Sequence, residues 1–212
     1  QGGSLTVLME HGPAMTAQEI YQRVNPAVVM VLADLSDSTS VGTGVIFREE
    51  DDRLYILTNA HVLEDAEEAY LYFDEETTAP VYLVGESVSN DLAVIYVNKS
   101  ELSEEILNQL KVATLGDSDT VRKGDLAIAI GSPYSQNMAH TTTVGIVTGV
   151  DQDFEIEDRV LNVIQTDAAL NPGNSGGALF NENGDQFCGD SKRYHGRTGF
   201  CDLHQSRQRS DR

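Results

Sequence analysis

The stretch NPGNSGGALFNENGD, residues 171–185, joins a glycine-rich turn to a short apolar run and then to a second turn. Pro172 fixes its own φ angle, and Gly173 can adopt backbone conformations closed to other residues. A turn of this kind can direct successive backbone N–H groups towards one point and expose the hydroxyl of Ser175 beside them. The pattern predicts an acyl-transfer site, and the alternative is an ordinary glycine-serine turn.

Short apolar runs separated by turn residues continue along the chain before this stretch, which is typical of an all-β sandwich or barrel. The runs are rich in Val, Ile, Thr and Tyr, whose side chains pack well on a pleated surface. One short helix is predicted at residues 103–110, beginning with a capping serine, and a single helical turn at 59–63. The predicted strands are 28–35, 44–47, 54–58, 69–73, 81–84, 92–97, 126–130, 141–150, 161–165 and 177–180.

A serine hydroxyl is a poor nucleophile unless a base removes its proton, so the sequence must supply a histidine and a carboxylate to orient it. His61 follows an apolar strand in LYILTNAHVL, where a short turn can present its side chain rigidly. Asp91 immediately precedes the apolar strand in SNDLAVIYV, at the edge of the core, where a buried carboxylate needs a partner. The alternatives are a histidine that merely caps a strand end and an aspartate in an Asx turn.

The order His61, Asp91, Ser175 is that of the double-barrel serine proteases. Five motifs occur in one order at suitable spacings: TNAHV, DLAV, GDSD, AIGSP and QTDAALNPGNSGGAL. Together they resemble the protease domain of the HtrA/Deg family of trypsin-like serine proteases. The similarity runs from about Pro26 to Asp185.

The resemblance implies an all-β fold, a trypsin-like double six-stranded β-barrel. It also implies that Ser175 is the nucleophile, that His61 is the general base and then the acid, and that Asp91 orients the imidazole. The backbone N–H groups of Gly173 and Ser175 would form the oxyanion hole. No cofactor and no metal are expected. Members of the family cleave unfolded or misfolded polypeptides, assemble as homotrimers and work in the bacterial cell envelope or outside the cell, so we expect the same here.

Charge divides the chain into two unlike parts. Residues 1–185 hold 8 Lys and Arg against 31 Asp and Glu, a net charge of −23, whereas residues 186–212 hold 6 against 3, a net charge of +3. The overall charge of −20 disfavours contact with nucleic acid and anionic lipid, because both are negatively charged, and we expect no nucleic-acid partner. No run approaches the roughly 18 to 20 apolar residues of a membrane span.

We therefore expect three segments. Residues 1–25 form an N-terminal arm, residues 26–185 form the protease domain with its two barrels meeting near 99–120, and residues 186–212 form an anomalous tail. Asn183-Gly184 predicts a hairpin whose second strand begins at once, but the sequence that follows, QFCGDSKR, is polar and does not alternate. The tail also holds both cysteines, Cys188 and Cys201, for which a disulfide is one alternative.

Related proteases have an apolar strand after this turn and a last core strand that begins Gly-Phe. Gly199-Phe200 is present here, and in one permitted coding of residues 199–205 the deletion of one nucleotide gives Gly-Phe-Ala-Ile-Ser-Ile. We hypothesise that residues from about 186 onward are read in a shifted frame.

The tail separates two function hypotheses. With an authentic tail, the second barrel is expected to be incomplete, and the protein is an inactive remnant or a non-catalytic binder of unfolded polypeptides. With a tail read in the wrong frame, the natural protein is a serine endopeptidase. The motifs favour the endopeptidase.

Overall fold

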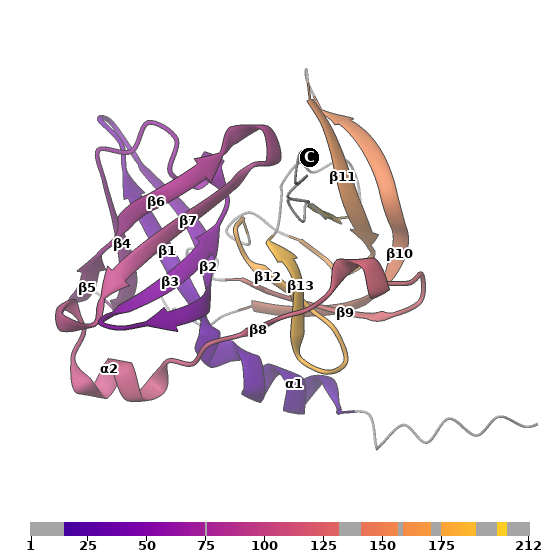
Figure 1. The fold of residues 1–212 in the computed structure, drawn as a ribbon, viewed down its shortest axis with the longest axis horizontal. Coiled ribbons are helices and arrows are strands. Elements are labelled where there is room, and N and C mark those ends of the chain that lie inside the picture. The colour runs from indigo at the N-terminus through magenta and orange to yellow at the C-terminus, as the bar shows by residue number, and fades with distance from the viewer. Residues whose placement is uncertain are drawn as a thin grey trace, which may run out of the picture.

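The protein consists of two curled β-sheets that lie side by side, with helix α1 beneath them (Figure 1). This computed structural model describes residues 15–74, 76–131, 141–156, 159–170, 175–189 and 199–202. Each sheet has seven strands. The prediction of an all-β fold is therefore confirmed, although each sheet has one strand more than the six expected.

The first sheet has the strand order β5-β4-β1-β2-β3-β7-β6. Its two outermost strands, β5 and β6, are consecutive in the chain and are separated only by Val81, so the sheet curls until its ends meet. The seventh strand is β5, which the sequence did not predict. The strand predicted at 81–84 corresponds to β6, and β5 ends at Pro80, which has no N–H to donate. The strands are β1 (Val28–Asp34), β2 (Thr39–Glu50), β3 (Arg53–Thr58), β4 (Glu68–Asp74), β5 (Thr77–Pro80), β6 (Tyr82–Ser87) and β7 (Leu92–Asn98).

The second sheet has the strand order β14-β11-β10-β9-β12-β13-β8. Its longest strand, β10, pairs with β9 through residues 141–146 and with β11 through residues 147–156, so one bent strand serves both halves of the sheet. The extra strand is β8, two residues that pair in parallel with β13. The strands are β8 (Thr114–Leu115), β9 (Leu126–Gly131), β10 (Thr141–Ile156), β11 (Arg159–Thr166), β12 (Ala178–Phe180), β13 (Asp185–Gly189) and β14 (Gly199–Asp202).

Helices are short and lie on connections. The helix predicted at 103–110 is confirmed as α2 (Glu104–Gln109), where the Ser103 hydroxyl accepts a hydrogen bond from the Ile106 N–H at 3.3 Å. The predicted turn at 59–63 is the 3₁₀ helix η2 (Ala60–Val62). The other 3₁₀ helices are η1 (Asn25–Ala27), η3 (Val88–Asn90), η4 (Lys99–Glu101) and η5 (Ser118–Thr120).

Helix α1 (Ala17–Val24) was not expected from the sequence, which we interpreted as an arm up to residue 25. Its signal was a capping box: the Thr16 hydroxyl accepts from the Glu19 N–H, and the Glu19 carboxylate accepts from the Thr16 N–H at 2.7 Å. That backbone hydrogen bond, with a second from the Thr16 hydroxyl, lowers the pKa of Glu19 below its usual value. The box is readable in the sequence, because Thr and Glu stand three residues apart.

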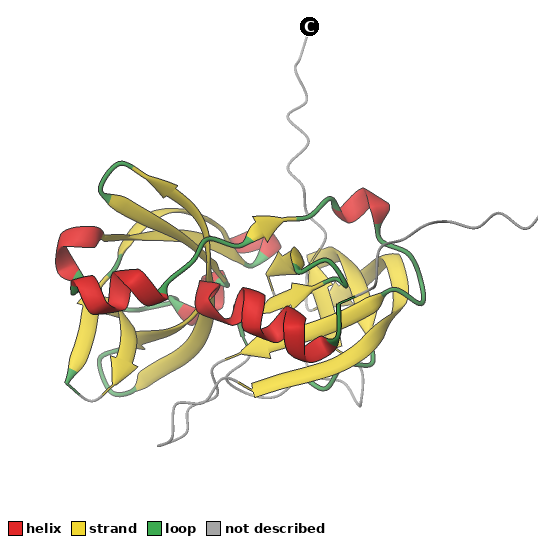
Figure 2. Cartoon of the chain, turned by 90° about the horizontal axis from the view of Figure 1, so that it is seen from below, coloured by secondary structure: helices red, strands yellow, loops and turns green. Residues whose placement is uncertain are grey.

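The apolar face of α1 fills the space where the two sheets meet. Ile20 and Val24 are buried against Phe180 of β12, and the same cluster contains residues of the first sheet. Viewed from below, α1 runs across the junction (Figure 2). The buried members of this junction core are Ile20, Val24, Ala27, Val28, Val45, Ala113, Ile128, Ile130, Ala178 and Phe180.

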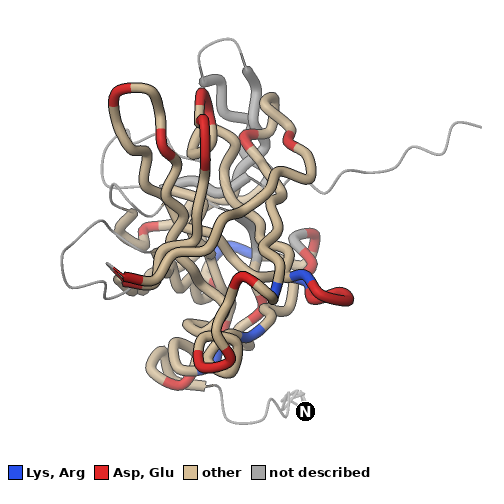
Figure 3. Tube along the Cα trace, turned by 90° about the vertical axis from the view of Figure 1, so that its left-hand side faces the viewer, with Lys and Arg blue, Asp and Glu red and all other residues tan. Residues whose placement is uncertain are grey.

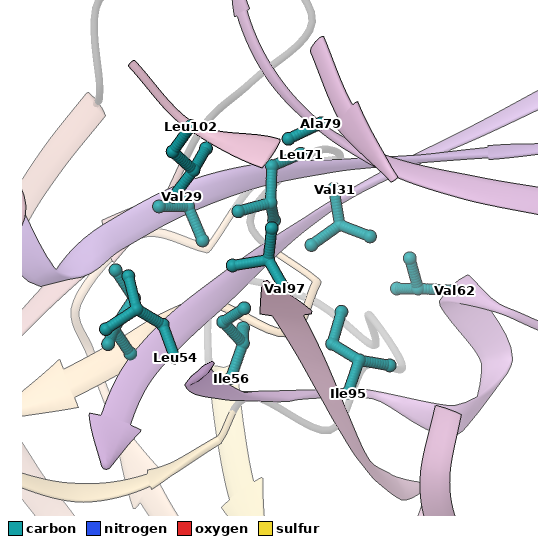
Figure 4. Packing of buried hydrophobic residues seen from close by; sticks show 11 residues of the cluster. Val29, Val31, Leu54, Ile56, Val62, Leu71, Ala79, Ile95, Val97 and Leu102 are labelled. Carbon is teal, nitrogen blue, oxygen red and sulfur yellow. The ribbon is translucent and has the colours of Figure 1, made fainter. Parts of the chain in front are cut away.

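The first sheet also encloses a core of its own, in which aliphatic side chains from facing strands meet (Figure 4). Leu71 and Ile56 point into it and are fully buried. A smaller third core lies within the second sheet. The buried residues of the first core are Val29, Val31, Ile46, Leu54, Ile56, Val62, Leu71, Ala79, Ile95, Val97 and Leu102.

Part of the anomalous tail belongs to the second sheet. The predicted hairpin at Asn183-Gly184 is confirmed, because β13 pairs with β12 after a turn in which Asn181 Oδ1 accepts the N–H groups of Asn183 and Asp185 at 2.9 and 2.8 Å. Strand β14 pairs with β11 in the register Thr166↔Gly199. We had expected the tail to leave this barrel without its last strands. The tail supplies these strands because the hydrogen bonds between strands join backbone N–H and C=O groups, which are present whatever the side chains are.

Among the described residues, Asp and Glu are spread over the loops and strand ends of both sheets, and Lys and Arg are few (Figure 3). None of the Asp, Glu, Lys or Arg side chains whose burial the structure describes is buried, so these charges lie on the solvated surface.

Leu71 and Leu83 allow the contribution of the first core to be measured with the same substitution at two sites. Leu71 is 0% exposed and Leu83 is 54% exposed. We expect Leu71→Ala to lower the free energy of unfolding by about 2–5 kcal/mol, because it leaves a cavity, and Leu83→Ala by about 0.5 kcal/mol or less. Urea unfolding followed by circular dichroism measures both, and equal effects would contradict this core.

Candidate active site

His61 stands in η2, directly after β3 ends at Thr58. Val62, the next residue, is buried in the core of the first sheet and anchors the turn. The imidazole therefore projects outward, with 36% of its side chain exposed. An apolar strand followed by a short anchored turn is the local arrangement that the sequence predicted.

Asp91 stands between η3 and β7 and binds His61 at two points. Its Oδ1 accepts the His61 backbone N–H at 2.9 Å, and its Oδ2 lies 2.7 Å from the ring Nδ1. The carboxylate is only 14% exposed. Because an ionised carboxylate only accepts, this contact places a proton on Nδ1, and in the neutral imidazole the lone pair is then on Nε2.

The backbone of Asp91 is left-handed, with φ 51° and ψ 43°, a conformation that aspartate tolerates better than most residues. Its N–H donates to the Val88 carbonyl at 3.3 Å. The turn aims the carboxylate at the imidazole.

Ser175 is buried at the junction of the two sheets, where its backbone is tied to the first sheet. Its carbonyl accepts the N–H of Thr43 of β2 at 2.6 Å. Gly42, the residue before, allows this approach, because a Cβ there would lie 2.6 Å from Val62 and 3.1 Å from the Ser175 carbonyl oxygen. Gly44 of the same strand is also closely packed, since a Cβ there would lie 2.5 Å from Ile56. Gly42 thus makes room for the turn that carries Ser175, called the serine turn below.

Asn59 is a residue that sequence reasoning missed. Its side chain is fully buried, its Nδ2 donates to the Asp91 carbonyl at 2.6 Å, and its Oδ1 accepts the Gly176 N–H at 2.6 Å. A polar side chain between an apolar strand and a histidine was the available signal. The residue before it, Thr58, donates its hydroxyl to the Thr43 carbonyl at 2.7 Å.

These contacts link the segments that carry the predicted residues. His61 and Asp91 are in direct contact, and the turn that carries Ser175 is joined through Asn59 to the Asp91 backbone. Gly173, predicted as an oxyanion-hole donor, lies outside the described residues. A pocket of about 260 Å³ opens beside the imidazole and is lined by His61, Asp91, Leu63, Glu64, Asp65, Glu86, Val88 and Ala60.

No group of three His, Cys, Asp or Glu side chains among the described residues could hold a metal ion. In the same part of the chain, no helix is both long enough and apolar enough to cross a membrane.

The family model of the trypsin-like peptidase domain matches residues 42–188. This range contains His61, Asp91 and Ser175. The chain belongs to the trypsin-like peptidase family. Among curated proteins it is 40% identical, over 158 residues, to the serine protease Do-like HtrA of Bacillus subtilis. It is also 40% identical, over 146 residues, to the serine protease Do-like HtrB of the same organism. These alignments cover 72% and 67% of this chain.

Among solved structures, the HtrA-type protease AlgW with a tripeptide superimposes with a TM-score of 0.73 at 32% identity. That alignment covers 89% of this chain and 60% of the other. The resemblance to HtrA-type proteases and the predicted trypsin-like barrel fold are thereby confirmed. The chain spans about a third of the length of the Bacillus relatives, 34% and 30%.

Alanine substitutions at Gly176 and Gly124 test how tightly the turn that carries Ser175 is packed. Both have positive φ angles, 77° and 96°, but a Cβ on Gly176 would lie 2.1 Å from the Thr43 carbonyl oxygen, whereas nothing lies within 4 Å of one on Gly124. We expect Gly124→Ala to cost about 1–2 kcal/mol of backbone strain. Gly176→Ala should cost about 1–3 kcal/mol more, because overpacking adds to the strain.

Thermal unfolding of both variants measures this difference. Equal stabilities would show that the serine turn is not enclosed as described.

Proposed function

We propose that the protein is a serine endopeptidase that hydrolyses peptide bonds through Ser175, His61 and Asp91. The observation that carries the proposal is the two-point contact of Asp91 with His61, at 2.7 Å to the ring and 2.9 Å to the backbone. Membership of the trypsin-like peptidase family supports it.

His61 would be the general base. With its proton on Nδ1 and held by Asp91, the imidazole has its Nε2 lone pair free to remove the proton of the Ser175 hydroxyl. The same proton would then pass to the leaving amine. Asp91 would keep the ring in this tautomer and stabilise the cation that forms, without taking the proton itself.

Ser175 would attack the scissile carbonyl and form an acyl-enzyme, which water then hydrolyses. The negative charge that develops on the carbonyl oxygen needs backbone donors, and we assign this role to the N–H groups of Gly173 and Ser175 from the motif. Removing one such donor in comparable enzymes costs about 3–4 kcal/mol of transition-state stabilisation.

The proposed substrates are unfolded or misfolded polypeptides. This class rests on the resemblance to the HtrA/Deg family, and the exposed side of His61 beside the pocket is compatible with a polypeptide substrate. Assembly as a homotrimer and a place in the bacterial cell envelope or outside the cell remain part of the proposal and rest on the family alone.

Ser175→Ala and Asp91→Asn test the triad. We expect the unsubstituted protein to cleave unfolded casein, Ser175→Ala to lose about a million-fold in kcat, and Asp91→Asn to lose about 10⁴-fold because the imidazole takes the wrong tautomer. Release of fluorescent peptides from labelled casein measures the rates.

Asp52→Asn is the matched control, because it makes the same chemical change on an exposed side chain. It should cleave like the unsubstituted protein. Cleavage that survives Ser175→Ala would refute the assignment of the nucleophile, and casein bound but never cut by any variant would favour the non-catalytic binder.

A further inference from the structure

The side chain of Asn59 is a buried amide whose nitrogen and oxygen both form hydrogen bonds. It is 0% exposed, and a buried amide must find partners because its desolvation is costly. Its two partners leave no doubt about its orientation: a carbonyl can only accept and a backbone N–H can only donate. The amide nitrogen therefore faces the Asp91 carbonyl, and the amide oxygen faces the Gly176 N–H.

Both partners belong to turns with positive φ angles. Asp91 has φ 51° and carries the carboxylate that binds the imidazole, while Gly176 has φ 77° and directly follows Ser175. One turn lies in the first sheet and the other leads into β12 of the second. Asn59 itself is two residues before His61, so a single side chain joins the segments that carry the acid, the base and the serine.

Local structure does not require this side chain. Asn59 occupies the position before η2, where an asparagine commonly caps the helix, but it makes no capping bond. Both of its hydrogen bonds go to distant residues, one of them 117 positions away.

We propose that Asn59 is a positioning residue of the peptidase site, which fixes the separation of the Asp91 turn from the Ser175 turn. The inference rests on the proposed function. Without the amide, the Asp91 carbonyl and the Gly176 N–H each lose a partner and the two sheets lose a direct link. The imidazole, which Asp91 holds, then shifts relative to the serine.

Asn59→Leu tests the inference, because leucine has nearly the same size and no hydrogen-bonding group. The matched control is Thr166→Val: the buried Thr166 hydroxyl also donates to one backbone carbonyl, that of Ile146 at 2.8 Å, and accepts one backbone N–H, that of Ala168 at 3.1 Å. Both variants lose one donor and one acceptor in a buried place, but only Asn59→Leu breaks the link between Asp91 and Gly176.

Two measurements are made on folded protein, as judged by circular dichroism. The first is the downfield proton resonance of the hydrogen bond between His61 and Asp91 in NMR spectra, which needs no catalysis. The second is the rate at which a fluorophosphonate labels Ser175, together with kcat and KM on a peptide. A misplacement of about 1 Å costs about a hundredfold in rate.

For Asn59→Leu we therefore expect the resonance to be lost, labelling and kcat to fall about a hundredfold, and KM to change little. Thr166→Val should keep the resonance and the rates. If Asn59→Leu keeps the resonance and reacts like Thr166→Val, Asn59 is only structural and the inference is overturned.

If Asn59→Leu does not fold, Asn59→Ala decides the same question, because it also removes the donor to Asp91 and the acceptor for Gly176 and its smaller side chain cannot clash with the surroundings. Loss of the resonance supports positioning, and its retention overturns it. If the unsubstituted protein is not labelled at all, the proposed function fails, while the resonance still decides whether Asn59 holds the pair of Asp91 and His61.

Discussion

The hydrogen bonds that cross the junction between the two sheets are the constraint on which the candidate site depends. Across the junction, the Thr43 N–H donates to the Ser175 carbonyl and the Asn59 Oδ1 accepts the Gly176 N–H. Within the first sheet, the Asn59 Nδ2 donates to the Asp91 carbonyl. All of these groups are backbone groups or a buried amide, so each needs its partner. The junction therefore has few alternative arrangements, and the side chains that project from it keep fixed positions.

Apolar packing holds the sheets together around these bonds. The junction core combines α1 with strands of both sheets, whereas the first core lies within one sheet. Burial of aliphatic surface contributes roughly 25 cal/mol per Å², but it has no direction. Packing brings the sheets into contact, and hydrogen bonds at the end of β3 then select the arrangement that places His61 beside Asp91.

The strands formed by the tail show that backbone pairing and side-chain pattern contribute separately to the second sheet. Strands β13 and β14 lie in the second sheet although the two apolar residues of each, a Phe and a Cys, are adjacent and do not alternate with polar ones. Pairing satisfies the edges of β11 and β12, because a sheet edge offers N–H and C=O groups to any extended segment. Side-chain pattern decides which face of a strand is buried, and that information is missing from this part of the sequence.

The sequence by itself determined the all-β class, most of the strands and the hairpin at Asn183-Gly184, and it singled out His61, Asp91 and Ser175 as candidates for the site. These features depend on residues close together in the chain or on motifs with fixed spacing. Only the tertiary structure decided that α1 packs into the junction and that Asn59 joins Asp91 to Gly176. The physical reason is that a buried amide is satisfied by partners 32 and 117 residues away, and no local pattern records which distant backbone groups will meet it.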